Sequence, residues 1–101
     1  MAEQAEPVLS TIGTASWTYE EGIAYEVAVE GISQVVGAYT GLIAAARNTH
    51  PDSPAVANWR EQQQIWERRR RDLHPGDTQR VADVRAECKA LLARLREDLQ
   101  G

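Results

Sequence analysis

Two histidines and one cysteine are the scarcest reactive side chains of this chain. His50 and His74 each precede a proline, at positions where the sequence predicts a helix to end. A cationic imidazole favours the last carbonyl groups of a helix, so both histidines are interpreted as capping residues. Cys88 falls in an apolar helical pattern, where a cysteine packs as a small hydrophobic side chain. These three residues predict structural roles rather than nucleophilic or acid–base catalysis.

The carboxylates do not form a recognisable metal site. Glu26 and Glu30 share one helix face, but no Glu-x-x-His accompanies them, as it does in helical bundles that hold two irons. No spacing of Cys, His, Asp and Glu matches a zinc site, and the sequence has no glycine-rich phosphate loop or dinucleotide fingerprint. We therefore expect no metal, no cofactor and no enzyme active site.

The segment 69–74 (RRRDLH) places an arginine five residues before a histidine. This Arg-x4-His spacing resembles the short motif of the HEPN ribonucleases, helical proteins in which the two side chains meet at a dimer interface and cleave RNA. The resemblance covers six residues and implies a small helical ribonuclease that uses Arg69 and His74. Arg70 takes the place of the Asn, Asp or His that is usual in the family, and Pro75 follows where the family has continuous helix.

Charge is distributed unevenly along the chain. Residues 1–59 carry seven acidic residues and one basic residue, a net of −6, whereas residues 60–101 carry ten basic and eight acidic residues, a net of +2. We expect an acidic first helix to pack beside more basic later helices. Four consecutive arginines are candidate contacts for an anionic partner, and we predict that carboxylates are their main partners: Arg68, Arg69, Arg70 and Arg71. A nucleic-acid-binding regulator is the alternative, although the interleaved acids and the net charge of −4 disfavour it.

Hydrophobic periodicity predicts an all-α protein in which a long first helix is the central element. After a tail at 1–17, a single helical domain (18–101) has three expected helices, at Thr18–Asn48, Ser53–Leu73 and Thr78–Leu99. Proline-containing linkers separate them, and linkers this short favour antiparallel neighbours. Thr18 and Glu21 fit a capping box, while a break of the first helix near Gly31 is the alternative to one continuous helix.

The apolar seams of the two later helices differ. The second helix has a thin seam at heptad spacing: Val56, Trp59, Trp66 and Leu73. The third helix has a fuller one: Val81, Val84, Cys88, Leu91 and Leu95. Two such helices cover only part of a long apolar helix, so the sequence predicts that more apolar surface remains to be covered.

The long first helix contains an uncharged run, Gly31–Ala46, in which small residues recur every four positions. Such spacing aligns them along one side of a helix, where another helix can approach closely. We expect the surface used for assembly to comprise seven residues: Ser33, Gly37, Gly41, Ala45, Ile23, Val27 and Tyr39. A homodimer is the simplest way to cover this surface, with a different protein partner as the alternative.

The function favoured by these patterns is a non-enzymatic interaction module: an adaptor, a regulator or a small subunit of a complex. The single cysteine allows no internal disulfide, and the acidic N-terminal sequence lacks the features of a signal peptide. The uncharged run is shorter than the roughly 20 residues that span a bilayer. We therefore expect a cytoplasmic protein that does not cross a membrane.

Overall fold

The computed structural model describes residues 17–100, and helices make up 87% of them. The three helices are α2 (Tyr19–Thr49), α3 (Pro54–Asp72) and α4 (Thr78–Gln100). No strand occurs in this range. The prediction of an all-α chain with three helices is confirmed, and each end of a helix lies within two residues of its expected position. The predicted tail lies outside the described residues, apart from Trp17.

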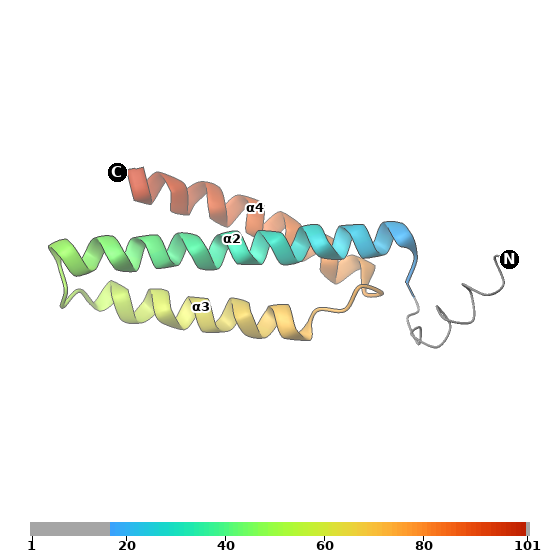
Figure 1. Cartoon of the computed structure of the whole chain (residues 1–101), viewed down its shortest axis with the longest axis horizontal. Coiled ribbons are helices and arrows are strands. Elements are labelled where there is room, and N and C mark those ends of the chain that lie inside the picture. Colours follow the sequence, from blue (N-terminus) through green and yellow to red (C-terminus); the bar gives the residue numbers. More distant parts are fainter. Residues whose placement is uncertain (1–16, 101) are drawn as a thin grey trace, which may run out of the picture.

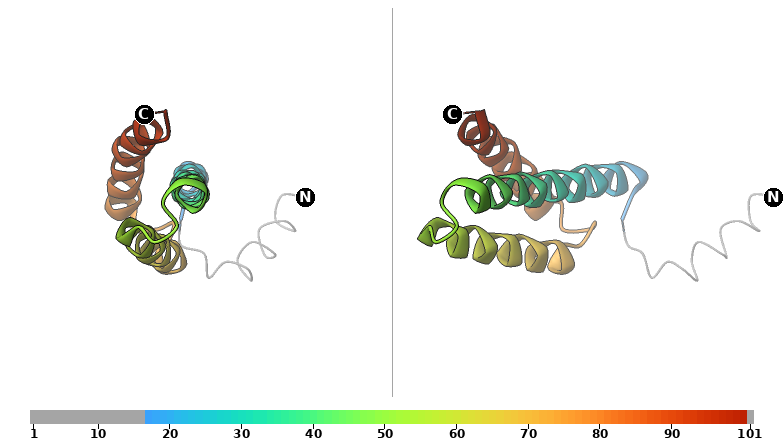
Figure 2. Two further views of the ribbon diagram at one scale, coloured as in Figure 1. Left: turned by 90° about the vertical axis from the view of Figure 1, so that its left-hand side faces the viewer. Right: turned by 60° about the vertical axis from the view of Figure 1, so that its left-hand side comes forward.

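Helix α2 is the central element and contacts both other helices. In Figure 1 the chain runs along α2, returns along α3 below it, and passes through a loop into α4. The end-on view in Figure 2 shows α3 and α4 on different sides of α2, with α4 inclined to the other two helices. One side of α2 therefore faces neither α3 nor α4.

The helix starts have the local interactions that the sequence predicts. The Thr18 backbone N–H donates to Glu21 Oε1 at 2.8 Å, and the Glu21 N–H donates to Thr18 Oγ1 at 3.1 Å, which completes the capping box of α2. Ser53 caps α3 by accepting a hydrogen bond from the Ala55 N–H. At α4 the Asp77 carboxylate accepts from the Arg80 N–H at 3.3 Å. These bonds satisfy backbone donors that have no partner within the helix.

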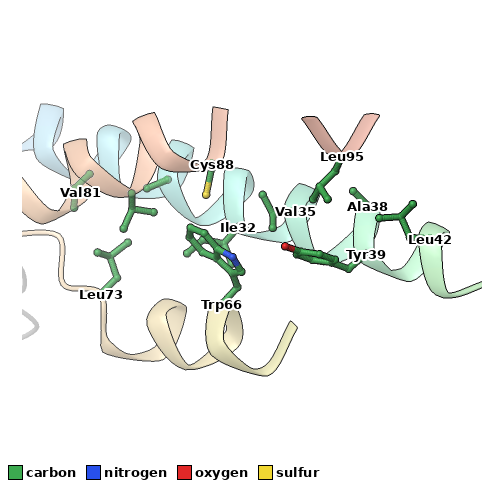
Figure 3. Packing of buried hydrophobic residues seen from close by; sticks show 12 residues of the cluster. Ile32, Val35, Ala38, Tyr39, Leu42, Trp66, Leu73, Val81, Cys88 and Leu95 are labelled. Atoms are coloured by element: carbon green, nitrogen blue, oxygen red, sulfur yellow. The ribbon is translucent and has the colours of Figure 1, made fainter. Parts of the chain in front are cut away.

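The core lies between α2 and the two helices that pack on it, and all three helices contribute to it (Figure 3). Trp66 points from α3 toward Ile32 of α2, while Cys88 and Leu95 approach from α4. Four large side chains are almost completely inaccessible to solvent: Ile32, Val35, Val81 and Val84. The seam predicted for α4 is buried except for Leu91, which is half-buried. Helix α3 contributes Trp66 to the core. Leu73, the residue that caps the C-terminal end of α3, is buried in the core as well.

Helix α2 is continuous through Gly31, so the alternative of a break there is wrong. A Cβ atom placed on Gly31 would lie 3.1 Å from the Cβ atom of Cys88. The missing side chain lets the α4 backbone come close at this point, and the packing offsets the roughly 1 kcal/mol that a helical glycine costs relative to alanine.

Candidate interaction surfaces

The small residues of α2 do not all face the same surroundings. Ser33, Gly37 and Ala45 are exposed, and a Cβ atom on Gly37 would meet no atom within 4 Å. Gly41 is half-buried, because a Cβ atom there would lie 3.2 Å from Cδ2 of Leu99 in α4. The predicted ladder is therefore open at Ser33, Gly37 and Ala45, whereas at Gly41 the C-terminal end of α4 already occupies the space.

The N-terminal half of α2 exposes large apolar side chains on the same side. Tyr19 is 81% exposed, Ile23 48% and Val27 46%. Their spacing of four residues places them along one line of the helix. Ile23 and Val27 thus lie at the surface, where a partner could contact them. Tyr19 lies on the same line, although the sequence analysis did not select it. We call Tyr19, Ile23, Val27, Gly37 and Ala45 the open face of α2.

Tyr39 was expected at the assembly surface, but it lies in the core. Tyr39 is only 6% exposed, and its side chain lies in the same cluster as Trp66 of α3 and Leu95 of α4 (Figure 3). Burial raises the pKa of its phenol, because the phenolate would lose hydration. The periodicity placed Tyr39 on an apolar face but could not show which neighbour covers it.

The arginine block divides into two pairs with different roles. Arg69 forms two hydrogen bonds with the Glu87 carboxylate, at 2.9 and 3.0 Å, and its guanidinium lies 4.2 Å from the centre of the Trp66 ring. These hydrogen bonds lower the pKa of Glu87. Arg70 pairs with Glu67 of its own helix through Nε at 2.9 Å. Within the chain, Arg69 and Arg70 therefore each have a carboxylate partner.

Arg68 and Arg71 instead face a groove between α2 and α3. This groove has a volume of about 780 Å³, and Arg47 and Arg60 line it as well. Its apolar floor includes Val36, Ile43 and Ala44. Sequence reasoning did not select Arg47 or Arg60, because only the packing of α3 along α2 brings them beside the arginine block. The sequence contains one weak indication that Arg47 contributes to a basic surface, because Arg47 is the only basic residue among residues 1–59.

Helix α2 packs beside α3 and α4, as expected, but no ion pair joins its charged residues to them in the described part of the chain. Between residues 17 and 100 the ion pairs are Arg69–Glu87, Arg70–Glu67 and Arg80–Asp77, and none includes a residue of α2. The Glu21 carboxylate accepts a hydrogen bond from Thr78 at 2.8 Å instead. Its bonds to the Thr18 backbone and to Thr78 lower the pKa of Glu21.

The histidines and the cysteine do not form a catalytic group. His50 caps α2 through its backbone N–H, which donates to the Ala46 carbonyl. His74 accepts a hydrogen bond from the Gly76 N–H at Nδ1, 3.0 Å away, and packs edge-on against Trp17. Cys88 is buried, and burial raises its pKa to about 11. His50 is thus the C-cap of α2, as predicted, although through its backbone, whereas the His74 side chain stabilises a loop and packs against Trp17 instead of capping α3.

The Arg-x4-His motif is split by the end of α3. Arg69 is in the last turn of the helix and is held by Glu87, whereas His74 follows the helix cap at Leu73 and contacts Trp17. The structure therefore does not bring the two side chains into one site. Across residues 17–100 no three His, Cys, Asp or Glu side chains are placed to share a metal ion.

Helix α2 also has the length and composition of a membrane-spanning helix. Its most apolar stretch has a mean hydropathy of 1.3, and 39% of that stretch is buried inside the protein. The core helix of a water-soluble bundle meets the same criterion, so this property of α2 does not distinguish between the two environments.

We find no match to this chain among protein-family models, curated proteins or solved structures.

Proposed function

We propose that this chain is a non-enzymatic protein-interaction module that assembles as a homodimer through the open face of α2. The observation that supports this proposal most directly is the exposure of Tyr19, Ile23 and Val27 along one line of a helix whose opposite side forms the core. Apolar side chains aligned in this way are typical of surfaces that a partner covers.

The order of residues along the open face favours a second copy as the partner. Bulky residues occupy the N-terminal half, and small residues occupy the C-terminal half. If two α2 helices pair antiparallel about a two-fold axis near Gln34, Ile23 of each copy falls opposite Ala45 of the other, and Val27 falls opposite Gly41. Ile23 then meets the exposed Ala45. Val27 meets the partly exposed Leu99 that packs over Gly41. A two-fold interface requires this self-complementarity.

In this proposal each chain contributes an antiparallel three-helix unit, and dimerisation completes it. The membrane-like composition of α2 then reflects a helix that is covered on two sides by its own chain and on a third by its copy. We further propose a cytoplasmic location, because the unpaired Cys88 suits a reducing compartment. The assembled dimer would then bind another protein as a subunit of a larger complex.

Cross-linking at the proposed axis tests the assembly. Gln34 is exposed on α2, and Gln34→Cys in a Cys88→Ser background should form an intermolecular disulfide rapidly under mild oxidation. Ala57→Cys in the same background is the matched control, because Ala57 is also exposed but lies on α3. Equal cross-linking rates for the two variants, or none for Gln34→Cys, would contradict the proposed dimer.

A further inference from the structure

The groove between α2 and α3 concentrates positive charge in a chain whose net charge is −4. Arg47, Arg60, Arg68 and Arg71 line it, and within the described residues none of the four forms an ion pair. The only carboxylate in the lining is Glu67, and Arg70 already binds it. Like charges that share one groove repel each other, so an anion that enters the groove gains attraction and relieves repulsion.

The chemistry of the lining indicates which kind of anion fits. The floor is apolar, and the Gln63 side chain beside it is engaged, because it donates to the Val36 carbonyl at 3.0 Å and to Thr40 Oγ1 at 2.8 Å. Among the residues that the structure describes, no aromatic side chain lines the groove, whereas surfaces that bind single-stranded nucleic acid stack bases on aromatic rings. A ligand with carboxylates along one edge and aliphatic groups along the other would satisfy both the arginines and the floor.

We propose that this groove binds an acidic peptide segment of a partner protein, with its carboxylates on Arg47, Arg60, Arg68 and Arg71 and its aliphatic side chains against Val36 and Ile43. From Arg60 to Arg71 the helix rises about 16 Å. An extended segment of about five residues covers this distance, and its alternate side chains point to opposite edges. The preferred sequence therefore alternates acidic and aliphatic residues.

This proposal goes beyond homodimer formation and does not depend on it. Gly37 does not line the groove. The groove should therefore keep its affinity in a Gly37→Leu variant, whatever the oligomeric state of that variant.

Fluorescence anisotropy with the full chain tests the groove. The probes are a labelled peptide that alternates Glu and Leu, the same peptide with Gln in place of Glu, and a single-stranded oligouridylate RNA. We expect the Glu peptide to bind and the Gln peptide to bind at least about tenfold more weakly, since each exposed ion pair contributes roughly 0.2–1 kcal/mol. The variant Arg68→Gln/Arg71→Gln should lose about tenfold in affinity for the Glu peptide.

The matched control is Arg85→Gln/Arg96→Gln, which removes two exposed charges from α4 and leaves the groove intact. This control should bind the Glu peptide within about twofold of the wild-type affinity. No binding of the Glu peptide, equal binding of the Glu and Gln peptides, tighter binding of the RNA, or an equal loss in the control would each overturn the proposal.

Discussion

Gly31 and Gly37 are the same residue type in one helix, but their surroundings differ. At Gly37 an added methyl group would enter open space, whereas at Gly31 it would lie 3.1 Å from Cβ of Cys88. We predict that Gly37→Ala raises the free energy of unfolding by up to about 1 kcal/mol, because alanine favours the helix. Gly31→Ala should give no such gain, since α4 would have to move. Thermal unfolding at high dilution, where self-association does not contribute, measures both values, and equal gains would refute this account of Gly31.

The burial of Cys88 makes the stability of the folded protein depend on pH. Burial raises its pKa from 9.0 to about 11, so the folded protein holds the thiol proton more tightly than the unfolded chain does. The resulting stabilisation is complete below pH 9 and is lost as the pH rises toward 11. We predict that the midpoint of urea unfolding falls over this range, and that Cys88→Ala, although less stable throughout, shows a shallower decline. A residual slope is expected from Tyr39, whose pKa is also raised by burial. The same decline in both proteins would contradict the role assigned to Cys88.

Individual helices were the most predictable level of this structure, because their signals are local. The Thr18–Glu21 capping box, the Ser53–Pro54 start and the Asp77 cap each depend on residues a few positions apart, and all three are present. The buried seam of α4 likewise follows from the helical period alone. Sequence reasoning was less successful with Tyr39 and with the arginine groove, because both depend on which helix lies beside α2 and at what angle.

The capping box gives a direct test of how much one helix end contributes. We predict that Thr18→Ala lowers the free energy of unfolding by about 1 kcal/mol, because the Glu21 backbone N–H loses the hydroxyl oxygen that accepts its hydrogen bond. Thr49→Ala is the matched control: the Thr49 hydroxyl donates to the Ala45 carbonyl in the last turn of the same helix and caps no N–H. That control should change stability by less than about 0.5 kcal/mol. Urea denaturation followed by circular dichroism compares the two, and an equal loss would argue against the cap.

On the scale of the whole molecule, α3 and α4 cover two sides of α2, and a remaining side exposes apolar residues. The sequence predicted that two helices would leave apolar surface uncovered, and the exposed Tyr19, Ile23 and Val27 agree with that expectation. The structure changes the choice of test residue. A Cβ atom at Gly41 would crowd Leu99 of the same chain, whereas a Cβ atom at Gly37 has no neighbour within 4 Å. Gly37→Leu therefore perturbs the proposed interface without perturbing the fold.

The most direct test of the homodimer is the mass of the purified chain, measured by light scattering at tens of micromolar. We predict the mass of two chains for the wild-type protein and the mass of one chain for Gly37→Leu, because a bulky side chain at position 37 keeps the two α2 backbones apart. The helical content should be the same in both proteins. A wild-type mass of one chain, 11.2 kDa, would contradict the account.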